Sequence, residues 1–195
     1  MDIEIRKLSP DLAEDYVHFF DITPHDDNVA EHKCYCVCWC NDDYKGHDFS
    51  TAEKRREGAL QYVKGNNIQG YLAYSGDTVV GWCNANTKSD CLKCASWQRF
   101  MDYVPLEKAD VKVKSIFCFV IAPEMKRKGI ATLLLERVCK DAIQDGFDFA
   151  EAYPYKEDSY QSSDFGGHLE MYIKSGFEVS FETDQGPVMR KQLRR

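Results

Sequence analysis

The 195-residue sequence contains no apolar stretch that approaches the ~20 residues needed by a membrane-spanning helix. Its opening residues, MDIEIRKLSP, also lack the apolar region of a secretory signal. No internal repeat or low-complexity linker divides the chain, and 44% hydrophobic content over this length is enough for one well-cored unit. We therefore expect a soluble cytoplasmic protein with no membrane partner, folded as a single domain over residues 1–195.

An excess of positive charge is missing as well. The 25 Lys and Arg residues are outnumbered by 32 Asp and Glu residues, which gives a formal net charge of −7 at pH 7. Such a chain repels a polyanionic nucleic acid at long range, except at a local basic patch. We therefore expect no nucleic-acid partner, and we favour small or cationic ligands.

Cysteine, by contrast, is abundant, with nine residues, yet no feature of the sequence supports a disulfide framework. Residues 34–40 read CYCVCWC, an alternation that predicts a strand with four thiols on one face. Same-face neighbours on a strand lie ~6.6 to 6.8 Å apart, too far for four thiolates to bind one zinc ion. Cys91 and Cys94 form a better half-site, but no second half-site has suitable spacing. We expect buried or pocket-lining thiols and no metal site.

The stretch from Ser115 to Ile143 has the clearest pattern in the chain. Ser115 to Ala122 is an almost unbroken apolar run rich in β-branched and aromatic residues, typical of a strand buried on both faces. Pro123 ends this strand, and apolar residues spaced four apart from Ile130 onward predict an amphipathic helix. The pattern therefore predicts a strand, a short basic turn and a helix.

The start of this predicted helix has the properties of an anion site. A first helical turn leaves backbone N–H groups without partners and carries the positive end of the helix dipole. Gly129 and the small Ala131 let a ligand approach the backbone, while Lys126, Arg127 and Lys128 add positive charge. A phosphate or pyrophosphate is the expected ligand. The P-loop and GxGxxG patterns are both absent, which argues against those two nucleotide sites.

The patterns in the rest of the sequence predict further strands and helices. Thr87 to Lys108 has no clean period and suggests a loop or short helix over a cleft. Ser50-x-x-Glu53 resembles a capping box at the start of a helix. The expected elements are a strand around Ile3 to Ile5, a helix from Asp11 to Asp21, a helix ending near Lys64, strands at Gln69 to Ser75 and Thr78 to Asn84, a strand at Phe147 to Tyr153, a helix at His168 to Ser175, and strands at Phe177 to Thr183 and Val188 to Leu193.

Two motifs resemble those of a known enzyme family. The run from Lys126 to Ala131, KRKGIA, resembles the Arg/Gln-x-x-Gly-x-Gly/Ala signature of the GNAT superfamily of acetyl-CoA-dependent N-acetyltransferases. Lys126 keeps the charge of the usual Arg but lacks its planar fork. The run from His168 to Phe177 contains Tyr-x-Lys-x-Gly-Phe and resembles the family's second hallmark. The asparagine often found seven residues before this tyrosine is replaced by Phe165.

The resemblance covers Lys112 to Leu193 well and the N-terminal half only in the order of elements. It implies an α/β (α+β) fold with a central, mixed, mostly antiparallel twisted sheet of about seven strands and about four flanking helices. It also implies that the central strand splays from its neighbour and leaves backbone groups free for acetyl-CoA. The residues that it places at this co-substrate are Phe119, Val120, Ile121, Lys126, Arg127, Lys128, Gly129, Ile130, Ala131 and Thr132.

Tyr172 is the candidate general acid, because the pKa of a phenol, ~10, is close to the ~8.5 of a thiol leaving group. The base is less clear, since Ser115 to Ala122 contains no carboxylate. Glu151 is the best candidate because it interrupts an apolar strand, although a solvent-facing edge residue is the alternative interpretation. Free N–H groups on the central strand would stabilise the oxyanion.

We therefore predict an N-acetyltransferase that moves acetyl from acetyl-CoA to a primary amine by direct attack, in preference to a cysteine-bound intermediate on residues such as Cys118 or Cys83. Two alternatives stay open: an acyl-CoA-binding sensor without turnover, and a cysteine-based zinc or redox protein. The acceptor, a small molecule or a peptide amine, is not encoded in any clear pattern. The oligomeric state stays open too, with a homodimer among the options.

Overall fold

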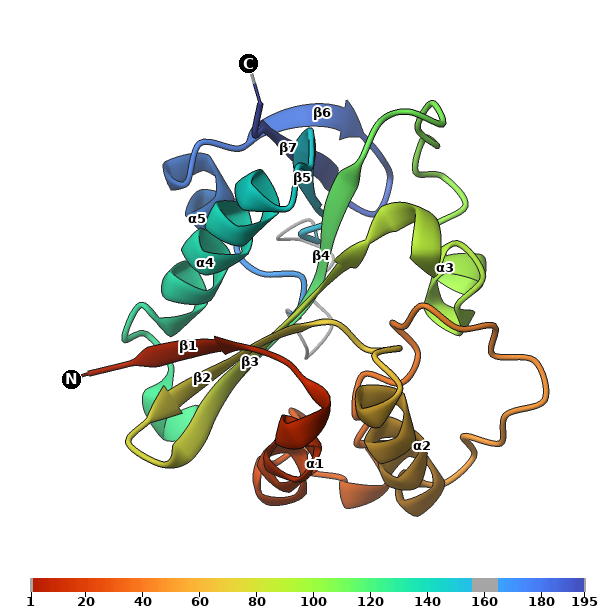
Figure 1. Ribbon diagram of the computed structural model, residues 1–195, viewed down its shortest axis with the longest axis vertical. Helices are drawn as coiled ribbons and strands as arrows, with labels where there is room; N and C mark the ends of the chain where they lie inside the picture. Colours follow the sequence, from red (N-terminus) through yellow and green to blue (C-terminus); the bar gives the residue numbers. More distant parts are fainter. Residues whose placement is uncertain (1, 156–164, 195) are drawn as a thin grey trace.

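The computed structural model describes residues 2–155 and 165–194, and its centre is one seven-stranded sheet (Figure 1). The strand order is β1-β2-β3-β4-β5-β7-β6. Every neighbouring pair is antiparallel except β4 and β5, which confirms the predicted mixed, mostly antiparallel sheet. The strands are β1 (Glu4–Lys7), β2 (Gly70–Ser75), β3 (Thr78–Thr87), β4 (Val113–Ile121), β5 (Phe149–Ala152), β6 (Glu178–Glu182) and β7 (Pro187–Gln192).

The described residues form five α-helices: α1 (Ala13–Ile22), α2 (Ala52–Lys64), α3 (Ala95–Phe100), α4 (Ile130–Gln144) and α5 (Leu169–Lys174). Helices α1 and α2 lie on one side of the sheet, and α4 and α5 on the other (Figure 1). The additional helix α3 has six residues and lies in the segment without a clean period. Short 3₁₀ turns occur at Pro10–Leu12, Ala30–His32, Lys88–Cys91 and Pro123–Met125. No helix in the described part of the chain is both long and apolar enough to cross a membrane.

The sheet separates two hydrophobic cores, because successive side chains of a strand point to opposite faces. On β2, Leu72 and Tyr74 pack with the residues of α1 and α2, whereas Tyr71 and Ala73 pack with those of α4. Helix α4 buries a continuous apolar stripe, as its four-residue spacing predicts. The stripe consists of Ile130, Leu134, Leu135, Val138, Cys139 and Ala142. The middle strand, β4, is thus covered on both faces over most of its length.

The two parallel strands separate halfway along β4. Their pairing ends where Ile116 lies opposite Ala152, while β4 continues to Ile121. On its other edge β4 stays paired with β3 as far as Ile121. Residues 117–121 of β4 therefore have no β5 partner, and this opening on the β5 side sets the position of the site described below.

Two local predictions were wrong. Residues 34–40 form turns rather than a strand: Val37 N–H donates to Cys34 O (3.2 Å), and Tyr35 and Cys36 have φ angles of 46° and 49°. Tyr35, Cys36 and Val37 are all buried, whereas a strand with one outward face would bury alternate residues. The helix cap is Thr51, whose side chain accepts a bond from Lys54 N–H, so the cap lies one residue later than predicted. Part of the expected polar loop before α5, residues 156–164, lies outside the described residues.

Candidate active site

A cavity of about 700 Å³ lies between the end of β4 and the start of α4; we call it the α4 cavity. All the residues predicted to bind the cofactor line it except Lys128, whose Nζ lies 3.7 Å from Met125 Sδ. The lining also includes Asp26, whose carboxylate lies 3.9 Å from Lys126 Nζ. The predicted residues in the lining are Phe119, Val120, Ile121, Lys126, Arg127, Gly129, Ile130, Ala131 and Thr132.

The first turn of α4 presents backbone N–H groups to this cavity. Gly129 stands at the N-cap with φ +80°, and the first turn contains no acidic residue. The bond from Leu133 N–H to Gly129 O (3.1 Å) closes the first helical turn, so the amides of Ile130, Ala131 and Thr132 have no acceptor within the helix. A Cβ added at Gly129 would meet no heavy atom within 4 Å. This open backbone suits a phosphate or pyrophosphate group.

The edge of β4 supplies fewer free amides than predicted. Phe119 N–H donates to Phe165 O (2.7 Å), because the chain that leads into α5 crosses this edge. The prediction that the Phe119 amide is free is therefore wrong for this structure. Ala122 N–H donates to Val80 O on β3 (3.0 Å). Since N–H groups alternate in direction along a strand, Ile121 N–H points away from β3, toward the α4 cavity that this residue lines.

A second cavity, of about 400 Å³, has an aromatic wall; we call it the aromatic cavity. Trp39 and Phe117 stack with ring centroids 4.4 Å apart, and Phe117 and Tyr153 stack at 5.6 Å. Phe100 and Tyr155, each about half exposed, also line it. The wall combines side chains from β4, from the turns at residues 34–40, and from the segments around α3 and after β5. Such a surface suits an apolar or flat ligand.

The cysteines are buried or pocket-lining thiols, as predicted, and those in the described structure are all free. Cys34, Cys36, Cys38 and Cys118 line the aromatic cavity. Burial raises the pKa of Cys38 to about 12. Among the described residues, the one group of three side chains close enough to share a metal ion contains no cysteine.

Cys91 and Cys94 line neither cavity. Both are fully buried, and Cys94 N–H donates to Cys91 O (3.0 Å). A hydrogen bond from Cys91 lowers the pKa of Cys94 to about 7. The pair is thus close in space but sealed from both cavities.

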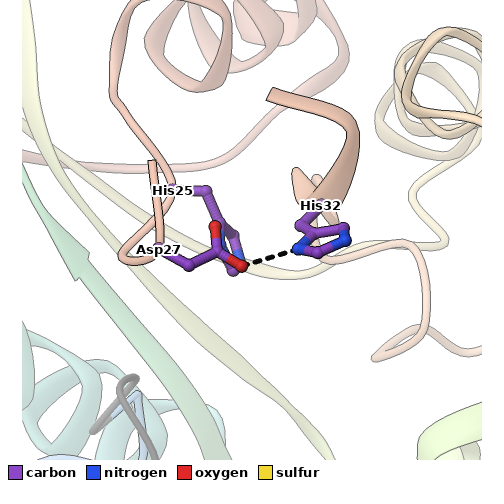
Figure 2. A group of neighbouring side chains, drawn as sticks. All are labelled: His25, Asp27 and His32. Carbon is purple, nitrogen blue, oxygen red and sulfur yellow. Dashed lines mark hydrogen bonds and ion pairs between the residues drawn. The ribbon is translucent and has the colours of Figure 1, made fainter. Parts of the chain in front are cut away.

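The two cavities meet at three residues that line both: His25, Cys34 and Phe165. His25 follows the end of α1, and its Nδ1 lies 2.7 Å from Asp27 Oδ1. The other carboxylate oxygen of Asp27 lies 2.6 Å from His32 Nδ1 (Figure 2). The sequence patterns do not predict this cluster. A carboxylate between two histidines in a loop that follows a helix is a weak signal, because their approach depends on the local turns.

Tyr172 is fully buried beneath the boundary between the cavities. Its hydroxyl donates to Gly166 O (2.6 Å), and Gly166 lines the aromatic cavity. The next residue, Gly167, lines the α4 cavity, and a Cβ added there would lie 3.0 Å from the Tyr172 hydroxyl. Gly166 and Gly167 thus separate the side chain of Tyr172 from the two cavities.

Glu151 is fully buried, so the interpretation as a solvent-facing edge residue is wrong. Its carboxylate lies 2.7 Å from Lys88 Nζ and 2.9 Å from Arg190 Nε. Tyr153 OH donates to the same carboxylate (2.7 Å) and also lies 2.8 Å from Ser115 Oγ. Glu151 lines neither cavity. Its link to the aromatic cavity is the hydrogen bond to Tyr153, whose ring forms part of the cavity wall.

Comparisons with known proteins agree with this architecture. The PaiA N-acetyltransferase of Thermoplasma acidophilum, solved in complex with coenzyme A, aligns over 98% of this chain and 99% of its own, with 18% identity and a TM-score of 0.55. An N-acetyltransferase of Staphylococcus aureus Mu50 aligns over all of both chains, with 12% identity and a TM-score of 0.52. The ribosomal-protein-S5-alanine acetyltransferase of Vibrio fischeri covers 98% of this chain and 93% of its own, with 11% identity and a TM-score of 0.53.

At these identities the solved structures establish the fold alone. No curated protein matches the sequence significantly. The profile of the acetyltransferase (GNAT) family matches residues 10–160, which is most of the chain and includes the whole α4 signature. The chain therefore belongs to the GNAT family of acetyltransferases, which use acetyl-CoA as co-substrate.

Proposed function

We propose that this acetyltransferase moves the acetyl group of acetyl-CoA to a primary amine by direct attack. The co-substrate lies in the α4 cavity, and the amine enters from the aromatic cavity. The observation that carries the proposal is the junction of the two cavities at His25, Cys34 and Phe165. There a thioester held from one side meets a nucleophile held from the other.

The α4 cavity fits the charged and polar parts of acetyl-CoA. The amides of Ile130, Ala131 and Thr132, together with Lys126 and Arg127, would hold the pyrophosphate. Ile121 N–H would bond the pantetheine arm, which the splayed half of β4 leaves room for. When bound, acetyl-CoA supplies an activated thioester carbonyl, and the protein's part is to hold that carbonyl at the junction.

The thiols near the junction support direct attack over a cysteine-bound intermediate. A thiolate, not a thiol, is the effective nucleophile. A hydrogen bond with Cys36 and burial raise the pKa of Cys34. A hydrogen bond from Cys36 lowers the pKa of Cys118, but burial and the neighbouring thiols together outweigh it, so the pKa is raised overall. Both groups are therefore thiols near neutral pH, and the acceptor amine itself is the better nucleophile.

Tyr172 is the proposed general acid for the departing CoA sulfur. Its hydroxyl would exchange the bond to Gly166 O for one to the sulfur and transfer its proton as the carbon–sulfur bond breaks. We propose no direct acid or base role for Glu151, because its carboxylate is enclosed by Lys88, Arg190 and Tyr153.

The aromatic cavity favours one class of acceptor. Its stacked wall of Trp39, Phe117 and Tyr153 offers flat apolar contacts and cation–π surfaces rather than rows of carboxylates. We propose a primary amine carried on an aromatic or other apolar body, either a small molecule or a peptide end. A long polyamine has less to contact here.

Calorimetry and a transfer assay test this function together. Purified protein should bind acetyl-CoA and CoA, and should release CoA when an amine with an aromatic body is added, faster than with an aliphatic polyamine. Absence of CoA binding would refute the proposal. Binding without release of CoA for any amine would identify the acyl-CoA sensor instead, and a preference for polyamines would refute the proposed acceptor class.

A further inference from the structure

We propose that His25 is the general base that takes a proton from the acceptor amine, and that Asp27 positions it. The inference rests on the proposed function, because it assigns a role in that transfer. An amine is an ammonium ion near neutral pH and attacks only after it has lost a proton. The base must therefore lie where the two cavities meet.

His25 is selected by its place at the junction. Of the three residues that line both cavities, Phe165 has no titratable group, and the raised pKa of Cys34 keeps it a neutral thiol. Other titratable side chains line one cavity only. Asp26 and His168 line the α4 cavity, and Asp102 lines the aromatic cavity.

Asp27 determines which nitrogen of His25 can act. An ionised carboxylate only accepts hydrogen bonds, so the short contacts to Asp27 require a hydrogen on Nδ1 of both His25 and His32. In the neutral ring this leaves the lone pair on Nε2 of His25. Val29 N–H donates to Asp27 Oδ1 (2.9 Å) and fixes the carboxylate. The bond from His32 is the main reason that the pKa of Asp27 is held well below its usual range.

The same three side chains could be considered as a metal site, but their geometry favours a hydrogen-bonded relay. The nitrogen–oxygen contacts of 2.7 and 2.6 Å are hydrogen-bond distances. Two ligands of a tetrahedral ion bound at ~2.0 to 2.2 Å lie ~3.3 to 3.5 Å apart. The rings of His25 and His32 are also nearly perpendicular, at 82° (Figure 2). A bound ion would need both hydrogen bonds to break.

The proton balance of the step is complete. Nε2 of His25 takes one proton from the ammonium group, and the nitrogen lone pair then attacks the thioester carbon. The intermediate collapses as the carbon–sulfur bond breaks, and the sulfur takes the Tyr172 proton. The second amine proton leaves the new amide nitrogen and restores the tyrosine through solvent, while His25 releases its own proton to water. The products are an acetamide, CoA thiol and one released proton.

The charges around His25 bear on its pH response. Its own chain segment contributes Asp26, Asp27, His32, Lys33 and Cys34. Other parts of the chain bring Lys126, Arg127 and His168 into the lining of the α4 cavity, where Lys126 pairs with Asp26. They bring Arg99 and Asp102 into the lining of the aromatic cavity.

The test compares His25→Asn with His18→Asn, because His18 is an exposed histidine in the middle of α1. The asparagine at position 25 keeps a donor for Asp27 but removes the Nε2 base. His25→Asn should lower kcat/KM at pH 7 by roughly 10²-fold while acetyl-CoA affinity is kept, and His18→Asn should change neither. Asp27→Asn should lower kcat/KM less than His25→Asn, since it disorients the ring without removing it.

The pH profile separates a base from a structural residue. Wild-type kcat/KM should rise with pH and level off once the base has lost its proton. His25→Asn should keep rising toward the pKa of the amine itself, because only the free amine then reacts.

Equal profiles for wild type and His25→Asn would refute the role of His25 while leaving the acetyltransfer intact. Bound zinc in stoichiometric amount, lost in both His25→Asn and His32→Asn, would refute it in favour of a metal site. A wild-type protein that binds acetyl-CoA but transfers nothing would instead refute the proposed function.

Discussion

The α4 cavity and the aromatic cavity are built in different ways. The α4 cavity depends mainly on one continuous strand, turn and helix, and much of its chemistry comes from backbone N–H groups. The aromatic cavity takes side chains from segments that are far apart in the chain, among them Trp39, Phe117 and Tyr153. A site made by consecutive residues leaves a pattern in the sequence, whereas a site assembled by the fold leaves only scattered residue types.

The buried carboxylate next to the aromatic cavity gives the largest expected effect. Glu151→Gln should lower the free energy of unfolding by roughly 3 kcal/mol, because Lys88 and Arg190 would lose the charge that compensates them. Urea unfolding measures this, with Glu107→Gln as the control, since Glu107 contacts the same cations but is partly exposed. If the variant were as stable as wild type but had a much lower kcat, this would support a role of Glu151 as the general base.

The hydroxyl of Tyr172 should matter for rate and not for binding. Tyr172→Phe should lower kcat by about 10²-fold with unchanged acetyl-CoA affinity, because the ring keeps its packing against Phe177. Tyr16→Phe is the matched control: Tyr16 is equally buried, and its hydroxyl also donates to a backbone oxygen, Tyr35 O (2.9 Å). Equal kcat values for the two variants would show that Tyr172 is only structural.

Most of the fold was predictable because its elements have clear periods. The strand expected at Ser115 to Ala122 is Val113–Ile121, and the helix expected at His168 to Ser175 is Leu169–Lys174. The strand predicted at residues 34–40 was wrong because alternating cysteines occur here in a buried run of turns, although alternation is also the pattern of a strand. The positive φ angles that close the turns, at Tyr35 and Cys36, have no marker such as glycine in the sequence.

Some parts of the site could also be predicted from the sequence, and others could not. The turn before Ile130 identifies the anion site, because helix starts follow general rules. Glu151 stood out as a carboxylate in an apolar strand, but its partners Lys88 and Arg190 lie far from it in the sequence. His25 acquires a partner through a local turn in which Asn28 N–H donates to His25 O (2.8 Å), and the sequence marks that segment only as polar.

Glycine at the start of α4 permits a direct test of the backbone site. Gly129 and Gly76 have φ angles of +80° and +60°, and a Cβ at either would meet nothing within 4 Å. Alanine at each position should therefore cost a similar ~1 to 2 kcal/mol of unfolding free energy. Only Gly129→Ala should also weaken acetyl-CoA binding, by about tenfold, or ~1.4 kcal/mol, because its methyl group enters the α4 cavity. Unchanged affinity in calorimetry would contradict the placement of the pyrophosphate at the start of α4.

The smallest effect separates two neighbouring cations of the basic turn. Arg127 lines the α4 cavity and Lys128 does not, although the family resemblance treats them alike. Arg127→Ala should raise the Kd for acetyl-CoA by about threefold at low salt, and this difference should shrink as salt screens the charge. Lys128→Ala should leave the Kd unchanged. An equal loss of acetyl-CoA affinity in both variants would mean that the basic turn acts through its total charge and not through specific contacts, because a diffuse potential does not distinguish adjacent side chains.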